Sequence, residues 1–316
     1  MNRILNHRTA SATLVALALL APCTNAVAQS AVRSGHTASM KGAPRGTLLI
    51  VGGGTQPQEL VKLFVDLAGG AGHARIAVVP MASEESAKSG KDKADELRAL
   101  GADVVVVDVR RAQADADSVV KLIDGATGIW FNGGDQARLT AQLQGSATLR
   151  AIHERYHNGA VIGGTSAGAA IMSDTMITGN QHFPGLAAPV DSGNSSSRIG
   201  RNTMEIIPGL GFLHGAIVDQ HFIRRQRENR LISVVLERPT LVGVGIDEGT
   251  ALRVYPDGHW QVLGASAAVV IDARVATVTP KGAPRLGGTG IRLSILPAGS
   301  TYEPRTGKAT LPKETR

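Results

Sequence analysis

The stretch 161-VIGGTSAGAAIM-172 decides the fold, because an apolar strand runs into Gly-x-Ser-x-Gly and continues directly into a helix-forming segment. At a sharp strand-to-helix turn the serine backbone is strained and the hydroxyl projects above the sheet. Gly164 and Gly168 leave the space that such a turn requires. The amide of Ala167 lies where it can donate to an oxyanion. The pattern predicts Ser166 as a nucleophile, and a packing turn of small residues is the alternative.

The regions around this motif alternate between buried-strand and helical patterns. Predicted strands span 47–51, 76–80, 104–109, 128–132, 160–162 and 241–246, and predicted helices span 59–67, 83–100 and 117–123. This alternation predicts an α/β fold, a parallel sheet covered by helices on both faces. Short apolar stretches at 251–255, 260–263 and 267–271 predict an antiparallel extension of the sheet.

Glycine runs follow two of the predicted strands, at 52–54 and at 133–134, and Ser166 follows a third. Ligands of parallel sheets bind beyond the carboxyl ends of the strands, so these segments are expected to meet at one edge. There, the amide of Gly53 is the predicted partner of the Ala167 amide in an oxyanion hole. A dinucleotide-binding loop is the alternative, but the run lacks G-x-G-x-x-G spacing and Pro57 stands where the helix would begin.

The first 28 residues have the pattern of an export signal. Basic Arg3 and Arg8 precede an apolar run at 12–21, and an A-x-A cleavage site ends the segment. The run is too short to span a bilayer. Its Cys23 is the chain's one cysteine, so no disulfide or thiol nucleophile is expected after cleavage. We expect a secreted or periplasmic protein that is not embedded in a membrane.

The rest of the chain is predicted as a flexible leader (29–45), a single α/β domain (46–300) and a frayed tail (301–316). Residues 180–201 are predicted as a mobile loop at the border of the active site, with a disordered insertion as the alternative. Aromatic residues make up 3% of the chain and the net charge is a modest +7, so a base-stacking nucleic-acid surface is not expected. No sequence motif suggests a metal or another cofactor. The oligomeric state stays open, with a homodimer as one option.

A serine nucleophile needs a base, and the base needs an orienting acid. Of nine histidines, His221 is the strongest candidate because a short apolar strand ends there in a polar cluster. A structural histidine is the alternative, and His214 and His182 are the reserves. For the acid, Asp247 and Glu248 follow the predicted strand 241–246, and alternation points them to opposite sides. The residues alone leave the choice between these two acids open.

Four arginines follow the histidine closely, at positions 224, 225, 227 and 230, with Glu228 as the only acid among them. A solvated basic helix face is one explanation. The other is a cluster that binds substrate carboxylates, since a planar guanidinium matches a carboxylate in bidentate geometry.

Three segments together resemble the cyanophycinases: GGTSAGAA at 163–170, FNGGDQ at 131–136, and DQHF at 219–222 with the arginines that follow. Cyanophycinases are serine peptidases related to aspartyl dipeptidase, with a three-layer α/β/α sandwich like that of class I glutamine amidotransferases. The resemblance extends from about residue 47 to about residue 271. It implies the triad order serine, histidine, glutamate, and therefore Ser166, His221 and Glu248.

The resemblance also implies a substrate. Cyanophycin has a poly-aspartate backbone with arginine joined through each β-carboxyl, and the family releases β-Asp-Arg dipeptides from a chain end. By matching position, the implied substrate-binding residues are Gln136, Asp219, Gln220, Arg225, Arg227 and Arg230.

Three other functions remain as alternatives. A related aspartyl dipeptidase or small-peptide hydrolase would use the same chemistry with a different pocket. A catalytically silent binding protein would keep the scaffold without turnover. An esterase of the α/β-hydrolase type would require an acid before the histidine, and no such order follows Ser166.

Overall fold

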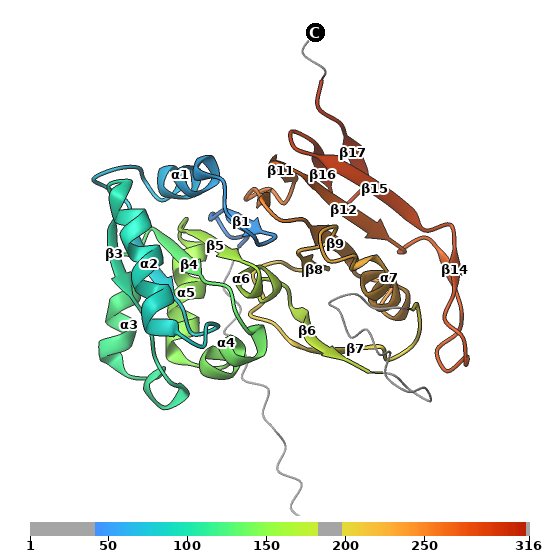
Figure 1. Cartoon of the computed structure of the whole chain (residues 1–316), viewed down its shortest axis with the longest axis horizontal. Helices are drawn as coiled ribbons and strands as arrows, with labels where there is room; N and C mark the ends of the chain where they lie inside the picture. The colour runs from blue at the N-terminus through green and yellow to red at the C-terminus, as the bar shows by residue number, and fades with distance from the viewer. Residues whose placement is uncertain (1–41, 183–197, 314–316) are drawn as a thin grey trace, which may run out of the picture. The chain divides into compact units, whose positions relative to one another are not determined.

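The computed structural model describes residues 42–182 and 198–313, and their centre is a nine-stranded sheet (Figure 1). Five parallel strands form one half in the order β1-β5-β4-β2-β3. They are β1 (Leu48–Val51), β2 (Arg75–Val79), β3 (Asp103–Val106), β4 (Gly128–Phe131) and β5 (Val161–Thr165). Four antiparallel strands continue the sheet beyond β1, namely β10 (Thr250–Val254), β11 (Trp260–Gly264), β16 (Thr301–Glu303) and β17 (Lys308–Thr310).

Helices cover both faces of the parallel strands. On one face lie α1 (Gln58–Leu67) and α2 (Ser86–Ala99), whose Phe64 and Leu97 pack with Leu49 and Trp130 of the sheet. On the other face lie α3 (Asp117–Ile123), α4 (Gln136–Leu143), α5 (Ala147–His157) and α6 (Ala167–Ala170), with the short η1 (Arg111–Gln113) between β3 and α3. The predicted three-layer α/β/α sandwich with a mostly parallel central sheet is confirmed.

A second sheet of four strands carries part of the site. Its order is β15-β12-β9-β8, with β8 (Ala216–Gln220), β9 (Val242–Ile246), β12 (Ala267–Asp272) and β15 (Arg292–Pro297). Helix α7 (Glu228–Glu237) lies against β9 and β12, and the opposite face of this sheet joins the main core (Figure 1). The described residues also form two small two-stranded sheets. One pairs β6 (Thr175–Gln181) with β7 (Met204–Pro208), and the other pairs β13 (Thr277–Val278) with β14 (Gly288–Thr289).

The tail predicted to fray is instead ordered, so that prediction is wrong for residues 301–310. Tyr302 in β16 is 2% exposed, and its ring centroid lies 5.3 Å from that of Trp260 in β11. Strand pairing and burial of one aromatic ring therefore hold this segment against the sheet.

The predicted export signal, most of the leader and residues 183–197 of the predicted mobile loop lie outside the described residues. Within the part of the chain that is described, no helix combines the length and the apolar character needed to cross a membrane.

Candidate active site

Ser166 occupies a strained turn between β5 and α6. Its φ of 54° and ψ of −109° lie in a region that non-glycine residues rarely adopt. The flanking glycines are required by close packing: a Cβ on Gly164 would lie 2.5 Å from the Gly168 carbonyl oxygen, and a Cβ on Gly168 would lie 2.2 Å from the Phe131 carbonyl oxygen. The turn is therefore pressed against β5 and β4, and it leaves the Ser166 side chain partly exposed.

Two hydrogen bonds connect Ser166 to a histidine and the histidine to a carboxylate. Ser166 Oγ lies 2.8 Å from His221 Nε2, and His221 Nδ1 lies 2.6 Å from Glu248 Oε1. The His221 side chain is 8% exposed and that of Glu248 is 32% exposed. The structure thus brings together the three residues that the resemblance implied.

The pairing of strands explains why such distant residues meet. Strands β1 and β5 are parallel neighbours, with Val51 opposite Thr165, so Gly52 and Ser166 leave the sheet together. Strands β8 and β9 are also parallel neighbours, and His221 and Glu248 follow their ends. The amide of His221 donates to the carbonyl of Gly52 at 2.6 Å, which joins the two sheets at the site.

Asp247 and Glu248 point to different partners, and this settles the choice that the residues alone left open. Asp247 accepts hydrogen bonds from the backbone amide of Arg224 at 2.9 Å and from the hydroxyl of Ser266 at 2.8 Å. Glu248 is therefore the acid that contacts His221. Of the reserve histidines, His214 bonds Asp174 at 2.7 Å, and the backbone amide of His182 donates to Thr203.

Burial lowers the pKa of His221, and the positive charges of Arg225 and Arg227 lower it further, while the hydrogen bond with Glu248 acts in the opposite direction. A lowered pKa leaves the imidazole neutral near neutral pH. A neutral imidazole that donates from Nδ1 to Glu248 presents an unprotonated Nε2 to the serine hydroxyl. His221 is therefore suited to accept the proton of Ser166.

The ends of β1, β4 and β5 meet at this point, as the sequence predicts. A Cβ on Gly53 would lie 2.3 Å from His221 Cε1, and a Cβ on Gly133 would lie 3.4 Å from Ser166 Cβ. Gly53 has a φ of +112°, which favours glycine. Ala167 begins α6, where backbone amides have no acceptor within the helix. These amides are the candidate donors to an oxyanion.

Three of the predicted substrate-binding residues form a buried cluster behind His221. Arg230 is 2% exposed and makes a bidentate ion pair with Asp219, which is 0% exposed, with Arg230 Nε 2.7 Å from Asp219 Oδ2. Arg227 donates to the carbonyl of Gln220 at 2.7 Å, and burial together with Arg230 lowers its pKa to about 10. The buried ion pair between Arg230 and Asp219 holds the end of β8 in place, and neither of its two charges is free to contact a substrate.

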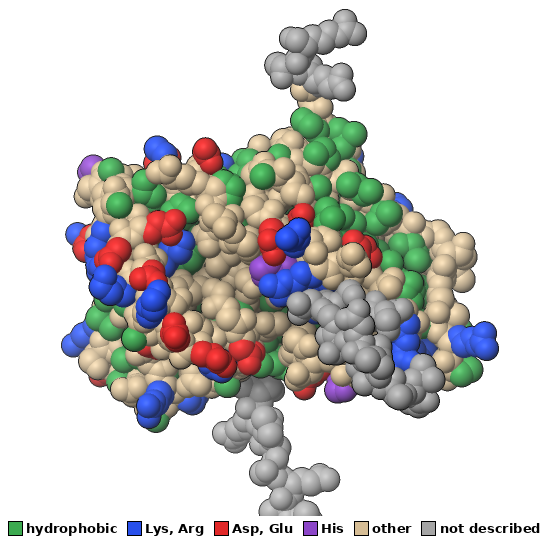
Figure 2. All heavy atoms as spheres, in the orientation of Figure 1, with side chains coloured by type: hydrophobic (Ala, Val, Ile, Leu, Met, Phe, Trp, Pro, Cys, Tyr) green, Lys and Arg blue, Asp and Glu red, His purple; other side chains and the backbone are tan. Residues whose placement is uncertain are grey.

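The other three predicted substrate-binding residues lie outside this buried cluster. Gln136 is buried at the start of α4 and donates to the carbonyl of Ile177 at 2.8 Å. Gln220 is 5% exposed, and its Oε1 has no partner among the described residues. Arg225 is partly exposed and close enough to influence His221. Figure 2 shows a histidine with basic side chains gathered against it near the middle of the face in view.

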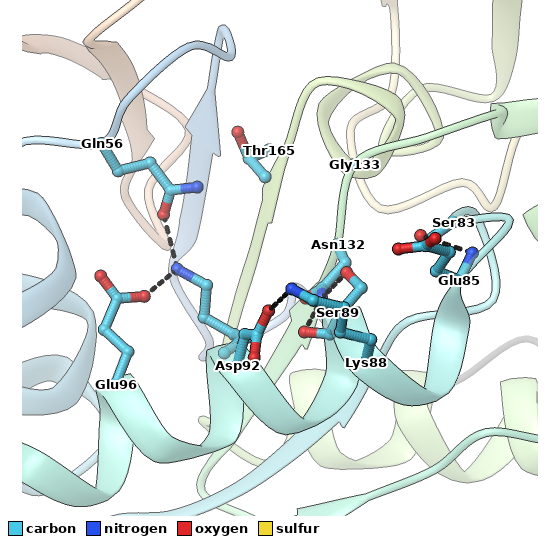
Figure 3. Close-up of a pocket in the computed structure, with 11 residues that line it drawn as sticks. Gln56, Ser83, Glu85, Lys88, Ser89, Asp92, Glu96, Asn132, Gly133 and Thr165 are labelled. Carbon is cyan, nitrogen blue, oxygen red and sulfur yellow. Dashed lines mark hydrogen bonds and ion pairs between the residues drawn. The ribbon is translucent and has the colours of Figure 1, made fainter.

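A cavity of about 380 Å³ lies beside the nucleophile, and the sequence did not predict it (Figure 3). Its walls include Asn132 and Gly133 after β4, Thr165 before the nucleophile, and charged residues of α2. Lys and Asp four residues apart on a helix are typical of a solvated face. For that reason the sequence gives no sign that α2 forms a wall of this cavity. The position of Asn132 at the carboxyl end of a parallel strand is the signal that predicts a lining role. Among the described residues no group of three or more His, Cys, Asp or Glu could hold a metal ion.

The sequence is similar to cyanophycinases over most of its length. It is 33% identical over 273 residues to a cyanophycinase of Synechococcus elongatus, covering 83% of this chain and 80% of the relative. It is also 33% identical over 272 residues to a cyanophycinase of a Nostoc species, covering 82% of this chain and 86% of the relative.

The fold matches that of a solved peptidase from an acI-B1 actinobacterium with a TM-score of 0.59 and 21% identity, covering 85% of this chain and 98% of the other. Residues 48–261 match the model of peptidase family S51, a range that contains Ser166, His221 and Glu248. The chain is a serine-type peptidase and belongs to peptidase family S51.

Proposed function

We propose that this peptidase is an exported cyanophycinase that hydrolyses the aspartate backbone of cyanophycin and releases β-Asp-Arg dipeptides. The observation that carries the proposal is the 2.8 Å contact between Ser166 Oγ and His221 Nε2, with Glu248 on the far side of the imidazole. The substrate is inferred from the two relatives, which are named cyanophycinases. Export is inferred from the signal pattern of the first 28 residues.

In the proposed mechanism His221 Nε2 takes the proton of Ser166 as the hydroxyl oxygen attacks the scissile carbonyl carbon. The negative oxygen of the tetrahedral intermediate accepts hydrogen bonds from the amides of Gly53 and Ala167. Collapse of the intermediate breaks the carbon–nitrogen bond, and the protonated imidazole gives its proton to the leaving amine. Water, activated by His221 in the same way, then releases the acyl group from Ser166.

The substrate-binding residues divide into two groups by burial. Arg225 is the arginine whose exposure suits contact with a substrate carboxylate, and Gln220 offers its unpartnered side-chain oxygen, Oε1. Asp219, Arg227 and Arg230 act through position, since they support the end of β8 that carries His221.

Purified protein incubated with cyanophycin is expected to release β-Asp-Arg dipeptides, identified by mass spectrometry. Simple aspartyl dipeptides, tested in parallel at equal concentration, are expected to be poor substrates. Cleavage of the small peptides without cleavage of the polymer would instead support an aspartyl dipeptidase. Cleavage of neither, by protein whose thermal unfolding is cooperative, would support a silent binding protein.

The pH dependence of the reaction is expected to follow the protonation of His221. Because its pKa is lowered, kcat/KM should fall only below the pH of about 6.5 at which an ordinary histidine titrates. Arg225→Gln removes a positive charge that lowers this pKa, so the acid limb of the profile should move to higher pH. Arg224→Gln is the matched control, since the adjacent Arg224 is exposed and is not among the groups that shift His221. A profile of Arg225→Gln that coincides with that of Arg224→Gln would contradict the assignment.

A further inference from the structure

The cavity beside the nucleophile is a trough with a charged wall. Glu85, immediately before α2, and Lys88, Asp92, Lys93 and Glu96 of α2 all line it. Glu85, Lys88, Asp92 and Glu96 follow one another at intervals of three or four residues, so they share one side of the helix, and Lys93 adjoins Asp92. At 1.5 Å per residue the stripe is about 16 Å long, with acids and bases in alternation. Figure 3 shows Lys88, Asp92 and Glu96 on α2, with Gln56 and Thr165 above the helix in this view.

The trough opens directly beside the nucleophile. Thr165, which precedes Ser166, lines it together with Gly133, whose Cβ position would lie 3.9 Å from Ser166 Oγ. The trough therefore adjoins the position of the nucleophile.

Two buried polar atoms at the trough lack hydrogen-bond partners among the described residues. Asn132 is 5% exposed and Thr165 is 8% exposed, and the unpartnered atoms are Asn132 Oδ1 and Thr165 Oγ1. The Asn132 amide is fixed by Nδ2, which donates to the carbonyl and the hydroxyl of Ser89 at 3.0 and 2.8 Å. A buried polar atom without a partner is unfavourable, so these two atoms indicate that a polar ligand completes the trough.

Lys93 is the charged residue of the wall that is not simply part of a solvated helix face. The Lys93 side chain is 11% exposed and lies 4.9 Å above the centre of the Trp130 ring. In Figure 3, Gln56 and Glu96 both point to one nitrogen, which is Nζ of Lys93, at 2.9 Å from Gln56 Oε1.

The acids of the wall outnumber its bases. Lys88 pairs with Asp92 at 2.6 Å, and Lys93 pairs with Glu96. Glu85 makes no ion pair among the described residues, although its charge helps to raise the pKa of Lys88, so three acids share the wall with two bases. The wall thus has an excess of negative charge, and two buried oxygen atoms beside it have no hydrogen-bond donor. Both features favour a ligand with a cationic group that can donate several hydrogen bonds.

Building on the proposed function, we propose that this trough binds an arginine side chain of the substrate next to the cleaved bond. An arginine joined through its amino group to a β-carboxyl keeps both its guanidinium and its carboxylate. The negative charges of Glu85 and Asp92 attract the guanidinium, and the unpartnered oxygens of Asn132 and Thr165 accept hydrogen bonds from it. The α2 wall thus makes arginine a requirement for tight binding.

The test uses two synthetic peptides that differ by one charge per unit, a trimer of β-Asp-Arg and the same trimer with neutral citrulline in place of arginine. Their dissociation constants are measured by calorimetry with Ser166→Ala protein, which binds without cleaving. The arginine trimer should bind about tenfold more tightly than the citrulline trimer, as expected for charge-assisted pairs in a partly exposed site. Adding Glu85→Gln and Asp92→Asn should reduce this preference to about twofold, whereas Asp95→Asn should preserve it. Asp95 is the matched control because it is an exposed acid of α2 outside the trough.

The outcomes separate the subsite from the proposed function. An arginine preference unchanged by Glu85→Gln with Asp92→Asn, or no binding of either trimer, would overturn the subsite. If the protein with Ser166 intact releases no dipeptide from cyanophycin, while Ser166→Ala protein still shows a preference that depends on Glu85, the subsite stands and the proposed function fails.

Discussion

Replacement of Ser166 by alanine is expected to lower kcat/KM for cyanophycin by about a millionfold, the scale seen when a serine peptidase loses its nucleophile. Alanine keeps the Cβ and therefore the backbone requirements of the turn between β5 and α6, so the fold should persist. Removal of Oγ eliminates both the attacking atom and the partner that lies 2.8 Å from His221 Nε2. Dipeptide release measured by mass spectrometry, together with thermal unfolding, checks both parts of the expectation.

A fluorophosphonate probe provides an independent measurement, since it labels an activated serine without requiring the natural substrate. Unaltered protein should be labelled at Ser166, and Ser166→Ala protein should not be. Ser118→Ala is the control, because Ser118 is an exposed serine of α3 with no contact to the site. Dipeptide release by Ser166→Ala at more than about a hundredth of the normal rate would remove Ser166 from the mechanism.

The parallel half of the fold is predictable because each strand contains a short run of apolar residues. The predicted strand 128–132 appears as Gly128–Phe131, and the predicted helix 117–123 appears as Asp117–Ile123. A strand buried on both faces needs apolar side chains on both, so composition alone identifies it. The predicted strand 104–109 appears as the shorter Asp103–Val106.

Partner choice among the later strands is not predictable from local pattern. Strand β12 was expected to extend the central sheet, but it pairs with β9 and β15 in a separate sheet. The alternation of side chains tells which face of a strand is buried, and it contains no information about the neighbouring strand. The same limit explains the error at β16, whose attachment depends on contact between Tyr302 and Trp260.

The site was predictable to different degrees. Ser166 was predictable because its whole signal, strand, glycines and helix, lies within a dozen residues. The burial of Arg230 was not, since its partner Asp219 is 11 residues away and the two meet only when β8 and α7 pack together. The direction of Glu248 also depends on a turn beyond β9, where the alternation of a strand no longer applies.

Replacement of Glu248 by glutamine is expected to lower kcat/KM by about a thousandfold or more. The carboxylate accepts a hydrogen bond from His221 Nδ1 at 2.6 Å, which holds the imidazole in the tautomer that leaves Nε2 free to accept the serine proton. A glutamine amide can donate to Nδ1 instead, which puts the imidazole proton on Nε2 and disables the base. It also provides no negative charge to stabilise the imidazolium that forms during attack.

The matched control for this change is Asp247→Asn, which removes a charge from the adjacent residue. Asp247 contacts Arg224 and Ser266 and makes no hydrogen bond with His221, so its loss should cost about tenfold at most. Glu248 raises the pKa of His221 whereas Arg225 lowers it, so the acid limb of the residual activity of Glu248→Gln should move to lower pH. Arg225→Gln should move the acid limb in the opposite direction, to higher pH. Two substitutions that merely destabilised the fold would not shift the pH profile in opposite directions. Activity of Glu248→Gln above a tenth of normal would show that another group orients His221.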